Sequence, residues 1–312
     1  MVEPKRVRPC DLSLYGTKGF LPGVGSINPG IASPKKGKSS SMKTFAFRFV
    51  GFTVALLAAT GLMTGTAAAQ NDGNISVGAG IDFVSDYYFR GIVQETGGFI
   101  AQPWLEAGIA VNENFSLTAG TWNSLHSVQA EGATVPSWYE SDFYAGLSGA
   151  TGSTSIDVTY TKYMSPRGSW GSVKELAIGV GYDTFIAPYA TVAIEMDSGG
   201  GADGGSNDGT YFELGVEPGL PLDTDTYSVS IPIALGLSLS DYYEGGTSDS
   251  SFGFFSLGAS LGVPLNGVPA EFGSWEFAGS LSLLVFGDGL KAINGSEDGA
   301  KVIALVGLSM GY

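Results

Sequence analysis

Apolar side chains alternate with small or polar ones along most of the chain beyond residue 70. In the segment 75–83, for example, Ile75, Val77 and Phe83 fall on one face of an extended chain and Asp82 on the other. Successive side chains of a strand point to opposite sides, so this two-residue period predicts strands with one apolar face. Beyond residue 70, no uninterrupted apolar run is long enough for a membrane-spanning helix.

The alternation divides this region into twelve expected strands. They lie within residues 75–83, 99–111, 115–119, 139–147, 156–164, 176–182, 186–194, 212–216, 229–239, 255–263, 275–285 and 302–312. Single-chain bacterial barrels have an even number of strands. Because lipid offers no hydrogen bonds to a backbone, strands cross a membrane only as a closed barrel without free edges. The sequence therefore predicts an all-β fold, a closed antiparallel transmembrane β-barrel of about 12 strands, whose first and last strands pair.

The connections between the expected strands alternate in length. Those after even-numbered strands are short, as at residues 112–114 and 183–184, whereas those after odd-numbered strands are mostly longer and polar, as at 124–137 and 241–251. Short periplasmic turns and longer extracellular loops mark transmembrane barrels, and a soluble β-sandwich has no reason to keep this phase. Both ends of the barrel chain are therefore expected in the periplasm.

The last expected strand, residues 302–312, carries apolar side chains at every second position and ends on an aromatic residue. Val306, Leu308, Met310 and Tyr312 share its apolar face. This pattern resembles the signal by which the barrel-assembly machinery recognises outer-membrane proteins. A soluble sheet can also end on an apolar edge strand, so the interpretation depends on the remainder of the chain.

The N-terminal 69 residues differ in kind from the barrel region. Residues 1–41 are rich in Pro, Gly, Ser and Lys and contain the single cysteine, Cys10. Residues 42–69 combine a short basic start, an apolar core and Ala67-Ala68-Ala69, which predicts a secretory signal peptide; an uncleaved anchor is the alternative. We expect Met42 to be the true start, with residues 1–41 a misread upstream or disordered segment, a cytoplasmic extension being the alternative.

The barrel region, residues 70–312, is more acidic than the whole chain. Nine of the 15 Lys and Arg residues but only two of the 30 Asp and Glu residues lie in residues 1–69, which leaves 6 basic and 28 acidic residues. Phosphate neutralisation needs Lys and Arg, so no nucleic-acid binding is expected. Without cysteine, the barrel region has no disulfide and no cysteine metal site.

The run Ser85-Asp86-Tyr87-Tyr88-Phe89-Arg90-Gly91 resembles an element near the start of the TorF-type porin family of proteobacteria. Further similarity lies in residues 119–124, 140–146, 156–160 and 211–215. Members of this family are barrel proteins of poorly defined function. The resemblance implies a channel in the outer membrane of a Gram-negative bacterium and names no solute.

Candidate pore-lining residues follow from the parity of the expected strands. Asp82, Asp86 and Arg90 occupy alternate positions, so on an extended chain they would all point into the barrel. The other candidates are Gln102, Glu106, Asp157 and Glu213. A ladder of such charges would guide polar solutes, and rings of acidic side chains favour cations. The alternatives are that Arg90 only neutralises acids of a neighbouring strand, and that the acidic residues serve solubility.

Two lysines interrupt the apolar parity of their strands. Lys162 and Lys174 lie close to the loop that joins the fifth and sixth expected strands. Near the membrane interface a lysine would snorkel and contact lipopolysaccharide phosphates. A shift of register by one residue would instead turn both towards solvent.

The sequence leaves three functions to weigh. The favoured one is passive diffusion of small polar solutes or ions, with a weak preference for cations. The second is a structural or adhesive barrel without an open pore, because Trp104 and Trp122 have interior parity, although Gly80 and Gly120 leave space for water. The third, a hydrolase built on Ser124 and His126, lacks an assignable third group.

We therefore expect no enzyme and no cofactor. The acidic loop around Asp203 lacks the spacing of an EF-hand, and no metal site is expected. The expected partners are outer-membrane lipids, the barrel-assembly machinery and small polar solutes. The solute and the oligomeric state stay open.

Overall fold

A computed structural model describes residues 74–127, 137–196, 201–221, 226–244 and 249–312. The expected N-terminal segments, 1–41 and 42–69, lie outside these ranges. Among the described residues, no helix is both long and apolar enough to cross a membrane.

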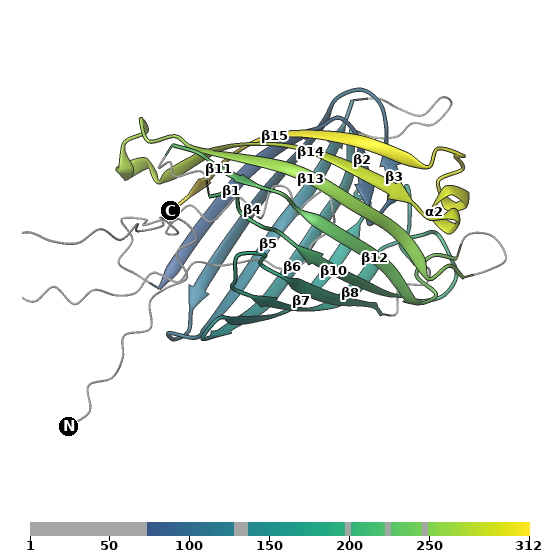
Figure 1. Ribbon diagram of the computed structural model, residues 1–312, viewed down its shortest axis with the longest axis horizontal. Coiled ribbons are helices and arrows are strands. Elements are labelled where there is room, and N and C mark those ends of the chain that lie inside the picture. Colours follow the sequence, from purple (N-terminus) through teal and green to yellow (C-terminus); the bar gives the residue numbers. More distant parts are fainter. Residues whose placement is uncertain (1–73, 128–136, 197–200, 222–225, 245–248) are drawn as a thin grey trace, which may run out of the picture.

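Twelve strands form the wall of the molecule (Figure 1). They are β1 (Ile75–Val84), β4 (Ile100–Ala110), β5 (Phe115–His126), β6 (Trp138–Thr151), β7 (Thr154–Met164), β8 (Val173–Tyr182), β9 (Tyr189–Glu195), β10 (Thr210–Val216), β11 with β12 (Ser228–Ser230 and Ile233–Ser240), β13 (Phe252–Pro264), β14 (Ser274–Phe286) and β15 (Ala300–Gly311). Both β11 and β12 pair with β13, so they count as one strand interrupted around Pro232, whose nitrogen has no hydrogen to donate.

Antiparallel pairing closes this wall into a barrel. The first strand pairs with the last, as at Ile81 and Leu308, and β13 pairs with β14, so the described wall has no free edge. Val77 and Tyr312 exchange two backbone hydrogen bonds of 2.8 Å each at the seam. The predicted barrel, its twelve strands and the pairing of its first and last strands are confirmed.

The outer surface of the wall is apolar. Large hydrophobic side chains of alternate positions are exposed along it, among them Leu105, Leu117, Phe143, Leu214 and Leu281. The side chains between them point inwards and are mostly polar, small or aromatic. A closed barrel satisfies every backbone group within itself, so this apolar surface can face lipid.

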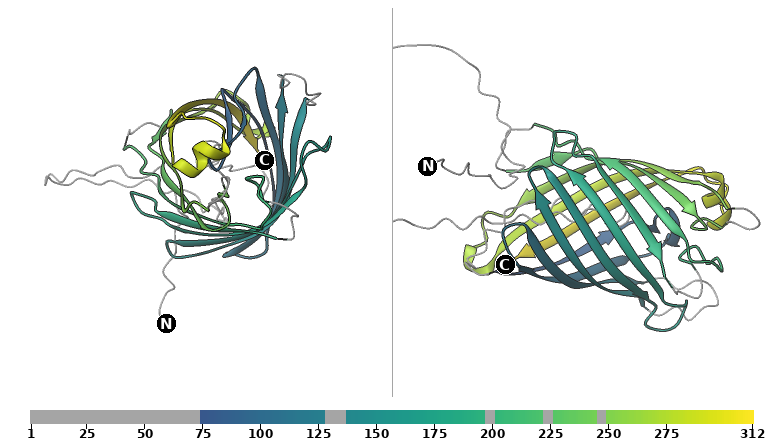
Figure 2. Two further views of the ribbon diagram at one scale, coloured as in Figure 1. Left: turned by 90° about the vertical axis from the view of Figure 1, so that its right-hand side faces the viewer. Right: turned by 90° about the horizontal axis from the view of Figure 1, so that it is seen from below.

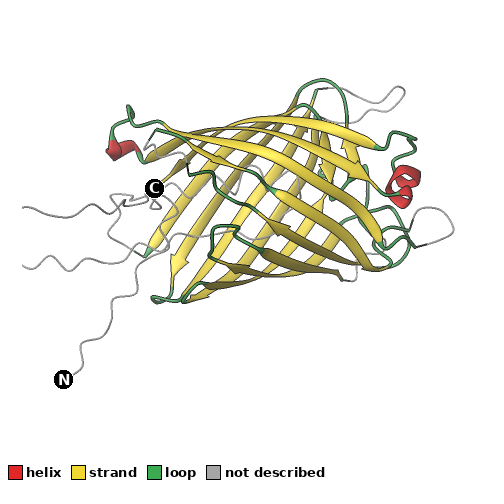
Figure 3. Ribbon diagram, viewed as in Figure 1, coloured by secondary structure: helices red, strands yellow, loops and turns green. Residues whose placement is uncertain are grey.

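The two ends of the barrel differ. Short connections join β4 to β5, β6 to β7 and β8 to β9 at the end where β15 terminates, and the three-residue helix η1 (Ala270–Phe272) also lies there (Figure 3). The opposite end carries the longer connections, including α2 (Asp288–Ile293). We call these the short-turn end and the long-loop end. By the rule for outer-membrane barrels, they face the periplasm and the outside of the cell.

The first long connection does not lie outside the barrel. It folds into the hairpin of β2 (Tyr87–Phe89) and β3 (Ile92–Glu95), which pair with each other and not with the wall (Figures 1 and 2). At the tip, Arg90 and Gly91 have φ angles of 49° and 83°, the left-handed conformation of a tight hairpin turn. The predicted shared inner face of Asp82, Asp86 and Arg90 is wrong beyond Asp82, because β1 ends at Val84 and the chain then turns into the hairpin.

Four inward aromatic rings lie against the wall. Each stands directly opposite a glycine of the adjacent strand, in the pairs Trp104 with Gly80, Tyr144 with Gly120, Tyr189 with Gly215, and Phe254 with Gly236. A Cβ atom at any of these glycines would collide with the facing ring. The Gly80 and Gly120 positions are therefore occupied by rings, and the Trp104 ring lies along the wall.

Candidate functional site

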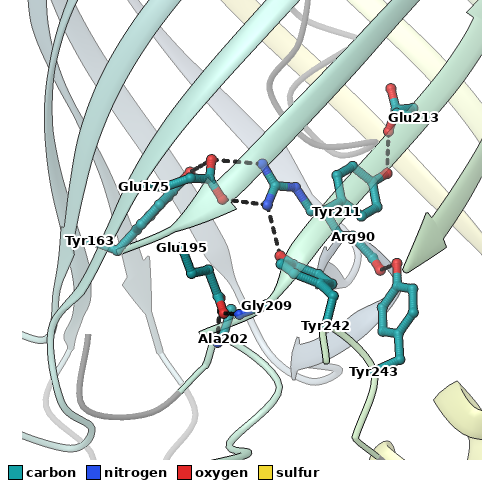
Figure 4. A network of polar contacts seen from close by, with 10 residues as sticks. All are labelled: Arg90, Tyr163, Glu175, Glu195, Ala202, Gly209, Tyr211, Glu213, Tyr242 and Tyr243. Carbon is teal, nitrogen blue, oxygen red and sulfur yellow. Dashed lines mark hydrogen bonds and ion pairs between the residues drawn. The ribbon is translucent and has the colours of Figure 1, made fainter. Parts of the chain in front are cut away.

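The hairpin carries a buried arginine that reaches the opposite wall (Figure 4). Arg90 Nη1 and Nη2 donate to the two carboxylate oxygens of Glu175 on β8, at 2.5 and 2.8 Å. Arg90 Nη1 also donates to the Tyr242 hydroxyl at 2.8 Å. Both members of the ion pair are 1% exposed. Bidentate pairing of this kind fixes a guanidinium in both position and orientation.

Aromatic rings enclose the same guanidinium. Its Cζ atom lies 4.4 Å from the ring centre of Tyr211, 5.0 Å from that of Phe89 and 5.3 Å from that of Tyr242. The ring faces attract a cation and exclude water from it. We call Glu175, Tyr211 and Tyr242 the cation cage; they belong to β8, to β10 and to the loop after β12.

Hydrogen bonds from other parts of the wall hold the cage in place. Tyr163 donates to Glu175 at 3.1 Å, and Tyr211 donates to Glu213 at 2.5 Å. Burial raises the pKa of the Tyr242 hydroxyl, in its loop, well above the ordinary value, so this group stays uncharged beside the arginine. A buried charge is tolerated only when it is paired and hydrogen-bonded, which the cage provides.

Further contacts fix the hairpin backbone. The Tyr243 hydroxyl donates to the Arg90 carbonyl at 2.9 Å. Asn294, just after α2, donates to the Gly91 carbonyl and accepts from the Val93 nitrogen, each at 2.9 Å. The hairpin is therefore held by the last long loop as well as by the cage, and it narrows the long-loop end of the interior.

A second polar cluster lies on the other side of the hairpin. Ser124 Oγ lies 2.9 Å from His126 Nε2, and Glu95 of β3 lies 3.7 Å from His126 Nδ1. The order of hydroxyl, imidazole and carboxylate resembles a hydrolytic triad, and Glu95 is the group that sequence reasoning missed. However, 3.7 Å is too long for a hydrogen bond, and Ser124 is completely buried, so the nucleophile has no exposed face for a substrate.

The predicted pore-lining residues on the wall strands all point inwards. Asp82 lies directly opposite Gln102, and Glu106 accepts a hydrogen bond of 3.0 Å from Tyr144. Asp157 and Glu213 are buried on the inner face of β7 and β10.

The two predicted residues in the first long connection have other surroundings. Asp86 forms an ion pair of 2.6 Å with Lys301 of β15, and Arg90 fills the cation cage. The acid that neutralises Arg90 comes from β8, which is not a sheet neighbour of the hairpin. Asp82 and Gln102 are neighbours on β1 and β4, whereas Glu106 contacts Tyr144 and Arg90 fills the cation cage, so these four side chains form no single cluster.

Carboxyl groups far outnumber basic groups on the inner wall. The inward carboxylates of the wall strands include Asp82, Glu106, Glu140, Asp142, Asp157, Glu175, Glu195 and Glu213. Among the described residues, the inward basic side chains are Arg90 and Lys301, and each already has a carboxylate partner. In the same ranges, no group of three or more His, Cys, Asp or Glu side chains is arranged to hold a metal ion.

The remaining predicted residues lie on the outside of the barrel. Lys162 and Lys174 are direct cross-strand partners on the outer face of β7 and β8, near the long-loop end. Val306, Leu308 and Tyr312 are exposed along the outer face of the last strand.

Comparison with known proteins identifies a family. A family model described as "Bacterial protein of unknown function (Gcw_chp)" matches residues 68–266. A search of curated proteins found no match. The family model does not confirm the TorF-type resemblance.

Solved barrels are similar at low identity. The chain is 7% identical to a KdgM porin in complex with disordered oligogalacturonate, with a TM-score of 0.41, covering 75% of this chain and 98% of that one. It is 9% identical to a NanC porin, with a TM-score of 0.43, covering 76% of this chain and 98% of that one. It is 11% identical to the CymD monoaromatic hydrocarbon channel, with a TM-score of 0.45, covering 84% of this chain and 95% of that one.

The closed barrel with an apolar outer face is the form in which strands span the outer membrane of bacteria. That is where the protein is located. Because the family model covers well over half of the 312 residues, the chain belongs to the Gcw_chp family of bacterial proteins of unknown function.

Proposed function

We propose that the protein is a porin-like channel for passive diffusion of small polar solutes or ions, with a weak preference for cations. The observation that carries the proposal is the inner wall, where carboxyl groups predominate and the aromatic rings opposite glycines lie against the wall instead of crossing the interior. The resemblance of residues 85–91 to the TorF-type porin family supports the same function.

Several polar atoms of the inner wall are buried without a partner. Gln102 Nε2, Trp122 Nε1, Asp142 Oδ1 and Asp157 Oδ2 have no hydrogen-bond partner within the protein. Leaving such groups without any partner costs about 1–3 kcal/mol each, so the free energy of the inner wall would fall if water or polar solutes reached them. Inward carboxylates around such a passage would attract cations.

A barrel without an open pore is the second candidate, and the hairpin is the observation that favours it. Tyr87 donates to Glu140 at 2.9 Å, and Tyr88 stacks on Phe286 with ring centres 5.5 Å apart. Together with Arg90, these contacts tie the hairpin to three sides of the long-loop end. The two candidates differ in whether ions pass the hairpin.

Conductance of the refolded barrel in a planar bilayer tests the proposal. We expect discrete current steps, and a reversal potential in a KCl gradient that indicates K⁺ over Cl⁻. The triple variant D82N/E106Q/D157N should move this potential towards zero. E113Q removes one carboxylate outside the barrel interior and should leave the potential unchanged, because Glu113 lies in the exposed turn between β4 and β5. Anion preference would contradict the cation preference, and absence of current at every voltage would favour the closed barrel.

A further inference from the structure

The cation cage has the parts of a ligand-binding site. It offers a carboxylate for two parallel N–H donors, the face of Tyr211 and the hydroxyl of Tyr242. Proteins recognise guanidinium and alkylammonium ligands with such combinations of carboxylates and aromatic faces. None of the three residues belongs to the segment that carries Arg90, since Glu175 lies 85 residues further along the chain.

The cage has its own supports and does not depend on Arg90 for its shape. Tyr163 holds Glu175, and Glu213 holds Tyr211. The rings of Tyr211 and Tyr242 are 5.1 Å apart, and the Tyr242 nitrogen donates to Ser238 Oγ at 3.1 Å. Removing the arginine side chain would therefore leave a formed site in the wall.

Further polar side chains surround the cage, beyond those that Arg90 contacts. Glu195 of β9 stands directly opposite Glu175 on the inner face, and its two carboxylate oxygens accept from the Ala202 and Gly209 nitrogens at 2.7 Å each. Thr161 is the register partner of Glu175 on β7; it is 1% exposed, and its hydroxyl has no partner in the protein. A ligand with a second cationic or donor group could reach these side chains as well.

We propose that the cation cage is a binding site for organic cations of the guanidinium class and that Arg90 occupies it as a tethered internal ligand. A solute that binds the cage displaces Arg90, frees the hairpin and widens the passage. The inference rests on the proposed channel function, because it assigns that channel both a solute class and an internal competitor.

Tethering determines which solutes compete. A group on a short linker acts at an effective concentration of about millimolar or above. A simple guanidinium ion must therefore be supplied at comparable concentration to displace Arg90. 4-Aminobutylguanidine adds a second cationic group, which the carboxylates around the cage should attract, so it should displace the arginine at lower concentration.

Binding to arginine-free protein is the first test. We expect calorimetry to detect methylguanidinium binding to refolded R90A, and at least tenfold weaker binding to R90A/E175Q and to the wild type. R90A/E113Q carries the same charge change outside the cage and should bind like R90A. Equal affinity of R90A and R90A/E175Q would overturn the proposal. Far-ultraviolet circular dichroism and heat-modifiable migration establish that each variant is folded.

A second test uses the arginine-containing hairpin and does not depend on R90A folding. Cys10 is the single cysteine of the chain, so T96C, at an exposed position just after β3, combined with C10S gives one labelling site. Titration with 4-aminobutylguanidine should change the fluorescence of a dye there, whereas NaCl of equal ionic strength should not. No change up to about 100 mM, well above the effective concentration of a tethered group, would overturn displacement.

Conductance separates the two proposals. If neither wild type nor R90A conducts, the channel function fails, while calorimetry still decides whether the cage binds guanidinium. If both conduct but R90A does not bind methylguanidinium, the cage proposal fails and the channel function stands.

Discussion

The two ends of the barrel are built in different ways from the same chain. At the short-turn end, neighbouring strands are joined by brief turns, and the seam is closed by backbone bonds between Val77 and Tyr312. At the long-loop end, the first loop turns inwards and is held by Arg90, Glu175 and residues of two other loops. Local pairing is sufficient to make the wall, whereas the narrowed entrance depends on contacts between distant segments.

Removing the charge of Glu175 should have the largest effect and should be confined to the long-loop end. E175Q leaves the Arg90 guanidinium buried beside a neutral amide, and breaking a buried ion pair in this way costs about 3–5 kcal/mol. We expect lower stability in urea unfolding of the barrel in lipid vesicles, and larger conductance steps because the hairpin is released. E113Q should change neither property. Unchanged unfolding and conductance of E175Q would show that the ion pair does not hold the hairpin.

Deleting Tyr312 tests the short-turn end. Its backbone bonds to Val77 close the seam, and its exposed side chain belongs to the proposed assembly signal. We expect less heat-modifiable barrel in the outer membrane, while the molecules that do assemble keep wild-type conductance. A normal amount of barrel after this deletion would contradict the role assigned to the last strand.

Substitution of Gly80 tests the wall between the two ends. A Cβ atom there would lie 2.6 Å from the Trp104 ring, so G80A must push the ring away from the wall. Such overpacking costs about 1–3 kcal/mol, and the displaced ring should also reduce conductance. G279A is the control, since its Cβ atom would meet only a carbonyl oxygen at 3.9 Å. Equal stability of the two variants would show that the ring has room to move.

The smallest effect is expected on the outer surface of the long-loop end. We propose that the paired Lys162 and Lys174 contact lipopolysaccharide phosphates. K162Q/K174Q should lower affinity for lipid A in a vesicle-binding assay several-fold, with conductance unchanged. Dephosphorylated lipid A should bind wild type and variant equally. A variant that keeps wild-type affinity for phosphorylated lipid A would refute the contact.

The sequence predicts the wall well because each wall strand carries its own two-residue period. The predicted strand boundaries are wrong where a proline or a turn interrupts this two-residue period. Pro232 interrupts the expected strand 229–239, and Ile186, assigned to a strand, lies in the turn before Tyr189. In both places a single residue or turn ends the strand, and the alternation of apolar and polar residues does not indicate where that happens.

The candidate site could be predicted only in part. The inward orientation of Asp82, Gln102 and Glu106 follows from parity, which the structure reproduces. The hairpin was hidden because Tyr87, Tyr88 and Phe89 are all buried and show no alternation.

The partners of Arg90 were hidden for a different reason. Glu175 and Tyr242 lie 85 and 152 residues away along the chain, and the sequence around Arg90 does not indicate that they are its partners. The sequence also does not predict the positive φ of Arg90, because an arginine followed by glycine is a weaker turn signal than Asn-Gly.

The pairing of rings with glycines also bears on how the barrel reaches its final alignment. Sliding one strand by a single residue would turn Trp104 or Tyr144 to the lipid side, and sliding it by two would move the ring from Gly80 or Gly120 to another side chain. Backbone hydrogen bonds alone hardly distinguish these alignments. Each ring opposite a glycine therefore favours one register of its strand pair over the neighbouring ones.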